Sequence, residues 1–528
     1  MVYCGKPSKG CANCRKRKIR CDQTEPSCLQ CQRAWFSCPG YRDPIELNFR
    51  DQSKDIIQKA RKSVPHAKDE SHIIKPDKEN KDSRYKRILR PSTCPEPKRG
   101  HNTQINYALS TSPTDQSICV FLHNYAPDDS VVVKVYLTTS QIVSHAISSH
   151  AVRCAVSAIG LAVIANTRNE PNPMVEAREK YATALRLTNM ALKNERKYLQ
   201  DTTLSAVLLL GMFEVMACGA PKSVENWQKH IIGAAALLQI WESRQNLTFT
   251  GVQLFMQLRL AVMANCLRTQ THVPATIKRL SRFATLNRSE ENIHSENLVS
   301  LVAEVSDLIA DMKSDGMPDF VEVIQRARDI DEGLYAWSLN LSSRWKYTVH
   351  TYSGSQHLGP NHTLNGYYHL YPDIWACNIW AYYRTARILV NLVIRDRLIP
   401  PLKMQPKWQN IFDAARVNIE RLSTDILLSV PFSISLRFSS SSFNDSGSRA
   451  GGCWGGYSIL WPLYVAASVS TPDSPNRKWA IGRLEYIGHS MGIGQAFLMA
   501  KVVRNELPHE SLSIYDYCRS YRSKVWTV

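Results

Sequence analysis

The chain has 528 residues, with 65 Lys and Arg against 46 Asp and Glu, so its formal net charge is +19. Hydrophobic residues make up 44% of it, which is enough to bury a large core and excludes wholesale disorder. No apolar run comes near the ~20 residues that a membrane-spanning helix needs. The longest candidate, Leu204 to Ala217, contains Glu214. We therefore expect a soluble, basic protein with no membrane partner.

The basic excess and the cysteines gather near the start of the chain. Residues 1–100 hold 24 Lys and Arg against 12 Asp and Glu, and seven of the 15 cysteines lie in the first 38 residues. The first residues contain no apolar segment of the kind that a secretory signal needs. We therefore expect an intracellular, reducing compartment, where clustered cysteines indicate metal binding rather than disulfides.

The clustered cysteines form a tandem repeat. The spacing C-x2-C-x6-C occurs twice, and a shift of 17 residues places the first three cysteines on the last three: Cys11, Cys14, Cys21, Cys28, Cys31 and Cys38. Thiolates in this number indicate zinc, which takes four ligands in structural sites. The first histidine is His66, so no imidazole completes either trio. Two zinc ions need eight ligand positions, which six sulfurs fill only if two of them bridge both metals.

The spacing does not decide which two sulfurs bridge. Because the repeats are related by a pseudo-twofold axis, the bridging cysteines must be equivalent. Three pairs satisfy this condition: Cys11 with Cys28, Cys14 with Cys31, and Cys21 with Cys38.

The two repeats differ in the residues between their second and third cysteines. The second repeat has only one basic residue there, Arg33, with Trp35 and Phe36. The first repeat has five basic residues: Arg15, Lys16, Arg17, Lys18 and Arg20. A short helix beginning at the metal ligands would project these side chains toward a polyanion, so double-stranded DNA is the expected partner. A solvated charge run or import signal is the weaker interpretation, because the run lies inside the metal site.

Residues 51–117 are polar and proline-rich and contain no Trp, a composition that predicts a basic, largely disordered linker. A short amphipathic segment at 51–62 is too short for a readable coiled coil. Beyond residue 118 the apolar residues recur at helical spacing, and strand-like alternation is nearly absent. We predict one large all-α domain over residues 118–528. Its expected helices cover 174–192, 204–217 with Asp201 as N-cap, 224–242, 252–271, 292–314, 318–343, 372–397, 407–428 and 475–503 with Ser474 as N-cap, and a flexible loop covers 437–452.

The segment from Cys11 to Cys38 resembles the DNA-binding domain of the fungal zinc binuclear cluster transcription factors. The resemblance implies a DNA-binding domain at residues 1–50 and makes Cys11 and Cys28 the bridging ligands. Cys14 and Cys21 then complete one zinc site, and Cys31 and Cys38 complete the other. It also implies that Arg17 and chiefly Lys18 read the bases of a CGG half-site in the major groove. The remaining basic residues, Arg15, Lys16 and Arg20, would contact phosphates.

Two further stretches, 227–234 and 456–464 with the following 479–500, are similar to the all-helical regulatory region of many filamentous-fungal members. Their residues are expected in the core. The implied fold is a small metal-stabilised zinc cluster domain with two short helices, a disordered linker and a large all-α domain. The implied function is a nuclear transcription factor at RNA polymerase II promoters. A homodimer and the transcription machinery are the implied partners, and a secondary-metabolite gene cluster is the implied target.

Two other functions compete with this interpretation. The run from Gly488 to Gly492 matches the G-x-S-x-G elbow of α/β-hydrolases, with Ser490 as nucleophile. A helix is expected before it, and His509 and Asp516 follow in the wrong order, so we expect no enzyme. A zinc adaptor or chromatin protein with a RING-like site is also disfavoured, because such sites use histidine and two separate zinc ions.

Overall fold

The computed structural model describes residues 10–24, 26–40, 112–126, 137–194, 196–243, 248–286, 290–313, 319–352, 363–398, 406–434 and 452–507. The predicted linker, the segment at 51–62 and the loop at 437–452 lie outside these residues, apart from a few residues at their ends. The elements are α1 (Ala12–Lys16), α2 (Leu29–Arg33), α5 (Pro113–Tyr125), α6 (Thr139–Ser148), α7 (His150–Arg168), α8 (Pro171–Lys193), α9 (Asp201–Met216), α10 (Pro221–Ser243), α11 (Phe249–Thr269), α12 (Ala275–Leu286), α13 (Glu290–Asp311), α14 (Phe320–Leu339), η1 (Ser343–Trp345), β1 (Thr348–Thr351), β2 (Tyr367–Leu370), α15 (Ile374–Leu398), α16 (Pro406–Ile434), α17 (Gly452–Val469), α18 (Pro475–Met491) and α19 (Gly494–Val503).

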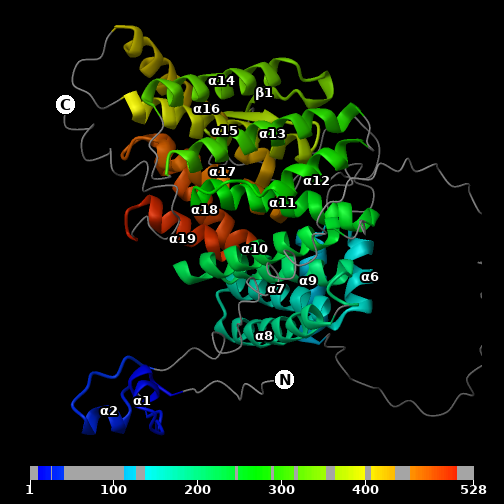
Figure 1. The fold of residues 1–528 in the computed structure, drawn as a ribbon, viewed down its shortest axis with the longest axis vertical. Coiled ribbons are helices and arrows are strands. Elements are labelled where there is room, and N and C mark those ends of the chain that lie inside the picture. Colours follow the sequence, from blue (N-terminus) through cyan, green and yellow to red (C-terminus); the bar gives the residue numbers. More distant parts are fainter. Residues whose placement is uncertain are drawn as a thin grey trace, which may run out of the picture.

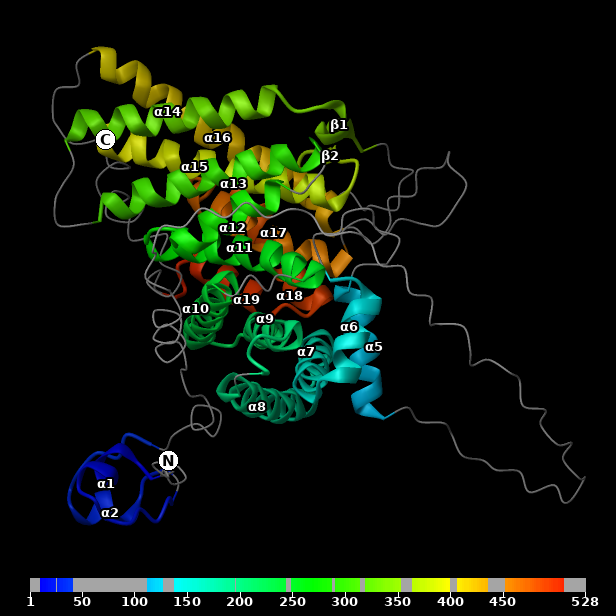
Figure 2. The ribbon, with the colours of Figure 1, turned by 45° about the vertical axis from the view of Figure 1, so that its right-hand side comes forward.

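From α5 onward the chain forms the predicted helical domain (Figure 1), and its helices fall into two groups. In the first group α7 packs against α5, α8 and α9, and in the second α15 packs against α13, α14 and α16. The last three helices join the groups, because α17 contacts α5, α15 and α16, whereas α18 contacts α7 and α19 contacts α9 (Figure 2). The two ends of the domain therefore pack against each other.

Helix α7 is the centre of the first group. Contrary to the expectation from the sequence, it is long and apolar enough to cross a membrane by length and composition, but 78% of the stretch is buried inside the domain. Gly160 lets α5 approach closely, because a Cβ there would lie 1.9 Å from the carbonyl oxygen of Ser117. The Ser117 hydroxyl also lies 2.8 Å from that of Ser157. Packing on all sides accounts for the apolar character of α7.

Helices α8 to α11 and α13 to α16 lie where the apolar periodicity places them, with ends shifted by a few residues. The first helix of the domain begins at Pro113, earlier than the predicted boundary at 118. The predicted N-cap at Asp201 is wrong, because Gln200 is the N-cap of α9. The predicted helix from 475 to 503 is broken at Gly492, whose φ is 71°. Ser474 caps α18 as expected, accepting a hydrogen bond of 3.2 Å from the Arg477 N–H.

The described residues contain one sheet, an antiparallel pair of short strands that the sequence analysis did not place. Its register pairs Thr348 with Leu370 and Thr351 with Tyr367. Strand β2 packs against α16, so the hairpin covers one end of the second helix group.

Candidate metal centre and nucleic-acid interface

The first cysteine of each repeat begins a short helix. Cys11 is the N-cap of α1, and Cys28 is the N-cap of α2. Each Sγ accepts a hydrogen bond of 3.4 Å from the backbone N–H three residues later, from Cys14 and Cys31 respectively. The C-x2-C spacing thus places two sulfurs on the first turn of a helix, and the sequence duplication is also a structural one.

The repeat extends to the ends of the two helices. At the end of α1 the N–H groups of Lys18 and Ile19 donate to the carbonyls of Arg15 and Cys14, both at 3.1 Å. This is the Schellman arrangement, in which the residue after the C-cap adopts a left-handed conformation. The same pattern recurs 17 residues later, and both Lys18 and Trp35 have φ of 56°. A bulky residue thus occupies the usual glycine position in each repeat.

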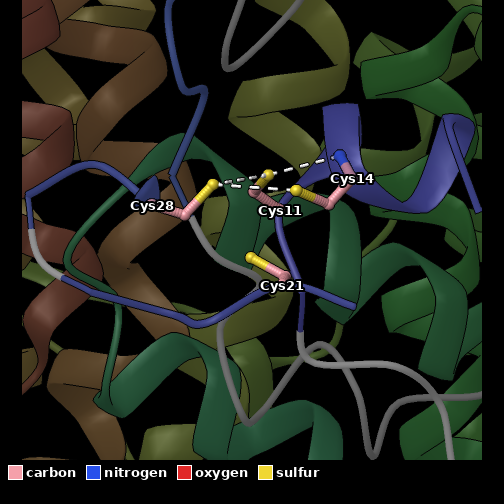
Figure 3. A group of neighbouring side chains, drawn as sticks. All are labelled: Cys11, Cys14, Cys21 and Cys28. Carbon is pink, nitrogen blue, oxygen red and sulfur yellow. Dashed lines mark hydrogen bonds between the residues drawn. The ribbon is translucent and has the colours of Figure 1, made fainter. Parts of the chain in front are cut away.

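The six predicted ligand cysteines lie together. Four are buried and two are half-buried. Their sulfurs form two groups of four, each with all atoms within 4.8 Å of one another. The first group contains Cys11, Cys14, Cys21 and Cys28, whose sulfurs point toward one another in Figure 3. The second contains Cys11, Cys28, Cys31 and Cys38. Two sulfurs, those of Cys11 and Cys28, therefore belong to both groups.

The spacing of these sulfurs fits tetrahedral zinc. Zinc–sulfur bonds of about 2.3 Å place tetrahedral ligands about 3.8 Å apart. The Sγ of Cys11 lies 3.7 Å from that of Cys28 and 3.6 Å from that of Cys31. The Sγ of Cys28 lies 3.7 Å from that of Cys14 and 4.0 Å from that of Cys38. The residues present can therefore hold two ions that share two sulfurs.

Burial explains why these thiols need a cation to ionise. It raises the pKa of the Cys11 thiol to about 12 and is also the main cause of the raised pKa values of Cys14 and Cys28. At the cluster edge, hydrogen bonds from the backbone of Cys28 and Gly40 lower the pKa of Cys38 to about 7. Zinc binds the thiolate form, so a divalent ion would replace the solvation that the buried sulfurs lose.

Two contacts that the sequence analysis missed join the halves. Asn13, between the first two cysteines, donates through Nδ2 to the Ser37 carbonyl at 2.9 Å and lies 3.7 Å from the Cys31 sulfur. The Arg17 guanidinium lies 5.5 Å from the centre of the Phe36 ring. Both contacts could have been suspected from the sequence, because Asn13 and Arg17 have no counterpart of the same type at the equivalent positions of the second repeat.

The five predicted DNA-contacting residues differ in their setting. Lys16, Arg17, Lys18 and Arg20 are exposed, whereas Arg15 is half-buried. The expectation that one short helix carries the basic run is wrong, because α1 ends at Lys16. The left-handed turn at Lys18 ends it, so the later basic residues extend from the turn and from the non-helical segment that leads to the third cysteine.

The second half is less suited to bind an anion. The Asp22 carboxylate accepts hydrogen bonds from the Thr24 hydroxyl and, at 3.1 Å, from the Leu29 N–H at the start of α2. These two bonds lower the pKa of Asp22 to about 2. A fixed negative charge therefore occupies the N-terminus of α2, where the helix dipole favours it. The positive potential of the module is concentrated on the first repeat.

The G-x-S-x-G run does not form a hydrolase site. Gly488 and Ser490 lie within α18, and Gly492 is its C-cap, so no strand precedes the serine. A Cβ at Gly488 would lie 2.7 Å from the Phe497 ring, and one at Gly492 would lie 2.9 Å from the backbone of Val163. These glycines allow helices α18, α19 and α7 to pack closely.

Comparison with family models gives two matches. Residues 9–47 match the fungal Zn(2)-Cys(6) binuclear cluster domain, and residues 107–505 match the fungal specific transcription factor domain. Together they contain every described residue except the last two, 506 and 507. No solved structure matches the chain.

Parts of the chain are similar to three named regulators. "Transcription factor dbaG" of Emericella nidulans is 28% identical over 142 residues, which are 26% of this chain and 32% of that protein. "White-opaque regulator 2" of Candida albicans is 46% identical over 46 residues, 9% of this chain and 10% of that protein. "Transcriptional regulatory protein moc3" of Schizosaccharomyces pombe is 46% identical over 41 residues, 7% of this chain and 8% of that protein. The chain thus matches at most about a third of the length of these relatives.

Proposed function

The chain belongs to the fungal-specific transcription factors that carry a Zn(2)-Cys(6) binuclear cluster, and from this membership we propose that it regulates RNA polymerase II promoters by sequence-specific DNA binding. The family consists of transcription factors, not of enzymes. The nucleus is therefore the compartment in which the protein would act. The observation that carries the proposal is the basic run of the first repeat, which lies between two cysteines of the metal centre and is mostly exposed.

The Zn(2)-Cys(6) domain binds zinc, and we assign two ions to it. Bound zinc would supply the positive charge that keeps the buried thiolates ionised. Cys11 and Cys28 would bridge the ions because they belong to both sulfur groups. Cys14 and Cys21 would complete one site, and Cys31 and Cys38 the other. The module is too small for a large apolar core, so metal ligation would provide most of its folding free energy.

Within this module Lys18 is the residue that we assign to base recognition. It is exposed and lies in the left-handed turn that ends α1, so its backbone position is fixed by two hydrogen bonds. Arg17 is its neighbour but also contacts the Phe36 ring, which limits its freedom to reach a base. Lys16 and Arg20 are exposed on either side and suit phosphate contacts. Arg15, half-buried, is assigned to a phosphate as well.

The finer parts of the proposal rest on family membership. A CGG triplet is the proposed half-site, since lysine and arginine donate well to the two major-groove acceptors of guanine. A homodimer and contacts with the transcription machinery are assigned to the helical domain. Control of a secondary-metabolite gene cluster is the proposed biological role.

A binding titration of the full-length protein tests the function. Fluorescence anisotropy would compare a labelled duplex containing CGG with a duplex of the same composition in which the triplet is scrambled. We expect tighter binding to the CGG duplex by at least about tenfold, and loss of that preference after zinc is removed with a chelator. Equal affinity for both duplexes, or a preference that survives zinc removal, would contradict the proposal.

A further inference from the structure

The helical domain contains a cavity of about 220 Å³ among its described residues. It lies where the two ends of the domain meet, and side chains of α5, α6, α9, α10, α11, α17 and α19 line it. In this region α17 contacts α19 (Figure 2). Five residues that the sequence predicts in the core are part of it or pack against it, and they also line the cavity: Trp227, Ile231, Tyr457, Leu460 and Trp461.

Two of the helices that line the cavity, α17 and α11, contribute different kinds of side chain. On α17 the aromatic side chains of Trp454, Tyr457 and Trp461 recur at one-turn and two-turn intervals. The Trp454 and Tyr457 rings are stacked, with centres 5.5 Å apart. On α11 the lining residues include Ala261 and Ala264, whose small side chains leave the space open. The lining is therefore aromatic along α17 and recessed at the two alanines of α11.

Apolar side chains predominate in this lining, although it also contains the polar side chains of Gln257 and Arg268. The indole N–H of Trp461 is buried and has no hydrogen-bond partner among the described residues. An indole N–H can only donate, and a buried donor without an acceptor costs free energy. Elsewhere in the lining, His145 Nδ1 and Ser205 Oγ form a hydrogen bond of 2.8 Å with each other. The N–H has almost no accessible surface in this structure, so the indole must turn toward the cavity before an acceptor on a ligand can satisfy it.

We propose that this cavity binds an uncharged, flat and mostly apolar small molecule that carries one hydrogen-bond-accepting oxygen. Its ring system would lie against the aromatic wall of α17, and its oxygen would accept from the Trp461 N–H. An apolar cavity of about 150 Å³ holds a benzene molecule, so the larger volume here suits two fused rings. The inference does not depend on DNA binding, since every residue that carries it lies in the helical domain.

Ligand occupancy would strengthen contacts between the two ends of the domain. Tyr125 of α5, Ala264 of α11 and Trp461 of α17 all line the same space, although they lie far apart in the sequence. A molecule that binds the folded domain and not the unfolded chain raises the unfolding temperature, and the effect grows with the logarithm of its concentration above Kd. The site would therefore make the stability of the regulatory domain depend on a small molecule.

Equilibrium dialysis of the full-length protein with two probes tests the proposal. The first probe is 2-acetylnaphthalene, which has the acceptor oxygen, and the second is 2-ethylnaphthalene, which lacks it. We expect the ketone to bind about fivefold more tightly, as one net hydrogen bond provides. Trp461→Phe keeps the ring, removes the N–H and should abolish this preference. Ala264→Phe fills the recess and should prevent binding of both probes.

Val417→Phe is the matched control, because it adds a ring to a residue of α16 that is 56% exposed. It should leave both affinities unchanged. Thermal unfolding of each variant shows whether the domain stays folded, and Trp461→Phe tests the proposal even if Ala264→Phe does not fold. Failure of the wild type to bind the ketone, equal wild-type affinity for the two probes, an unchanged preference in Trp461→Phe, or undiminished binding in a folded Ala264→Phe would each overturn the proposal.

Discussion

The sulfur atoms of Cys11 and Cys28 lie 3.7 Å apart, and each also lies within reach of the other cysteines of both groups. These two residues occupy equivalent positions in the two repeats, as the N-caps of α1 and α2. The pseudo-twofold axis that relates the repeats therefore passes between them. Of the three pairs that the spacing allows, this is the pair whose sulfurs belong to both groups. The geometry thus singles out one arrangement of shared ligands.

Removal of a shared cysteine should disrupt both metal sites, whereas removal of an unshared one should disrupt one. Native mass spectrometry of the wild type is expected to show two zinc ions per chain. Cys28→Ala should lose both ions, because each tetrahedron is left with three ligands. Cys21→Ala, the matched control, should retain one. Two ions retained in Cys28→Ala would be incompatible with the bridged arrangement.

Lys18 and Lys16 should differ in what they contribute to DNA binding. Lys18→Ala should lose discrimination for CGG over scrambled triplets by ~1–3 kcal/mol, because a base contact is lost. Lys16→Ala should weaken binding to both duplexes alike, because a phosphate contact is lost. The slope of log K against the logarithm of the salt concentration should fall by about one unit. Anisotropy titrations over a range of salt concentrations measure both effects. Equal losses of specific and nonspecific affinity in the two variants would refute this division of roles.

Trp35 should be an unfavourable residue for the stability of the module. It is 95% exposed and has a left-handed backbone with φ of 56°, which costs a non-glycine residue roughly 1 kcal/mol. Trp35→Gly is therefore expected to raise the chelator concentration needed to strip half of the zinc by about fivefold. Gln32→Gly, inside α2, should lower that concentration, since glycine is disfavoured in a helix. A lower concentration for Trp35→Gly would show that Trp35 makes a stabilising contact.

Glu214 should make the helical domain less stable as pH rises from about 4.5 to about 7. Burial raises its pKa from 4.5 to about 7, although the Tyr181 hydroxyl donates to it at 2.6 Å. The folded state therefore keeps a proton that the unfolded chain releases between those values, and the unfolding free energy falls across that window. Glu214→Gln removes this titration and should be more stable than the wild type at pH 8, on the order of 1–3 kcal/mol.

Urea unfolding followed by circular dichroism at pH 5 and pH 8 measures the effect of Glu214. The exposed Glu179→Gln on α8 serves as the control and should keep the wild-type dependence on pH. If the unfolding free energy of Glu214→Gln falls with pH as steeply as that of the wild type, another group causes the pH dependence.

Local patterns predicted much of the fold. The amphipathic helices α8 and α14 bury one face only, so their apolar residues recur at helical spacing and were found. Helix α7 escaped detection because fourteen of its residues are buried and no polar face marks its period. The break at Gly492 was missed because the apolar pattern continues on both sides, although a glycine with positive φ commonly ends a helix.

The cysteine spacing predicted the metal centre, because three cysteines recur at the same spacing 17 residues later. The choice of bridging pair was not, since it depends on how the two helices face each other. The left-handed turn at Lys18 was hidden as well, because lysine gives no sign of a position that glycine usually occupies. The cavity is lined by helices that lie far apart in the sequence, such as α11 and α17, so no local pattern indicated it.

Genome-wide mapping of the tagged protein on DNA in its host tests the central claim most directly, with wild type and Cys28→Ala compared at equal protein levels. We predict discrete occupied sites in promoters, enriched in CGG triplets, that disappear in Cys28→Ala because the zinc module no longer folds. Occupied sites that are the same in both proteins, or a wild type without any enriched sites, would contradict the assignment of this chain as a zinc-dependent, sequence-specific regulator.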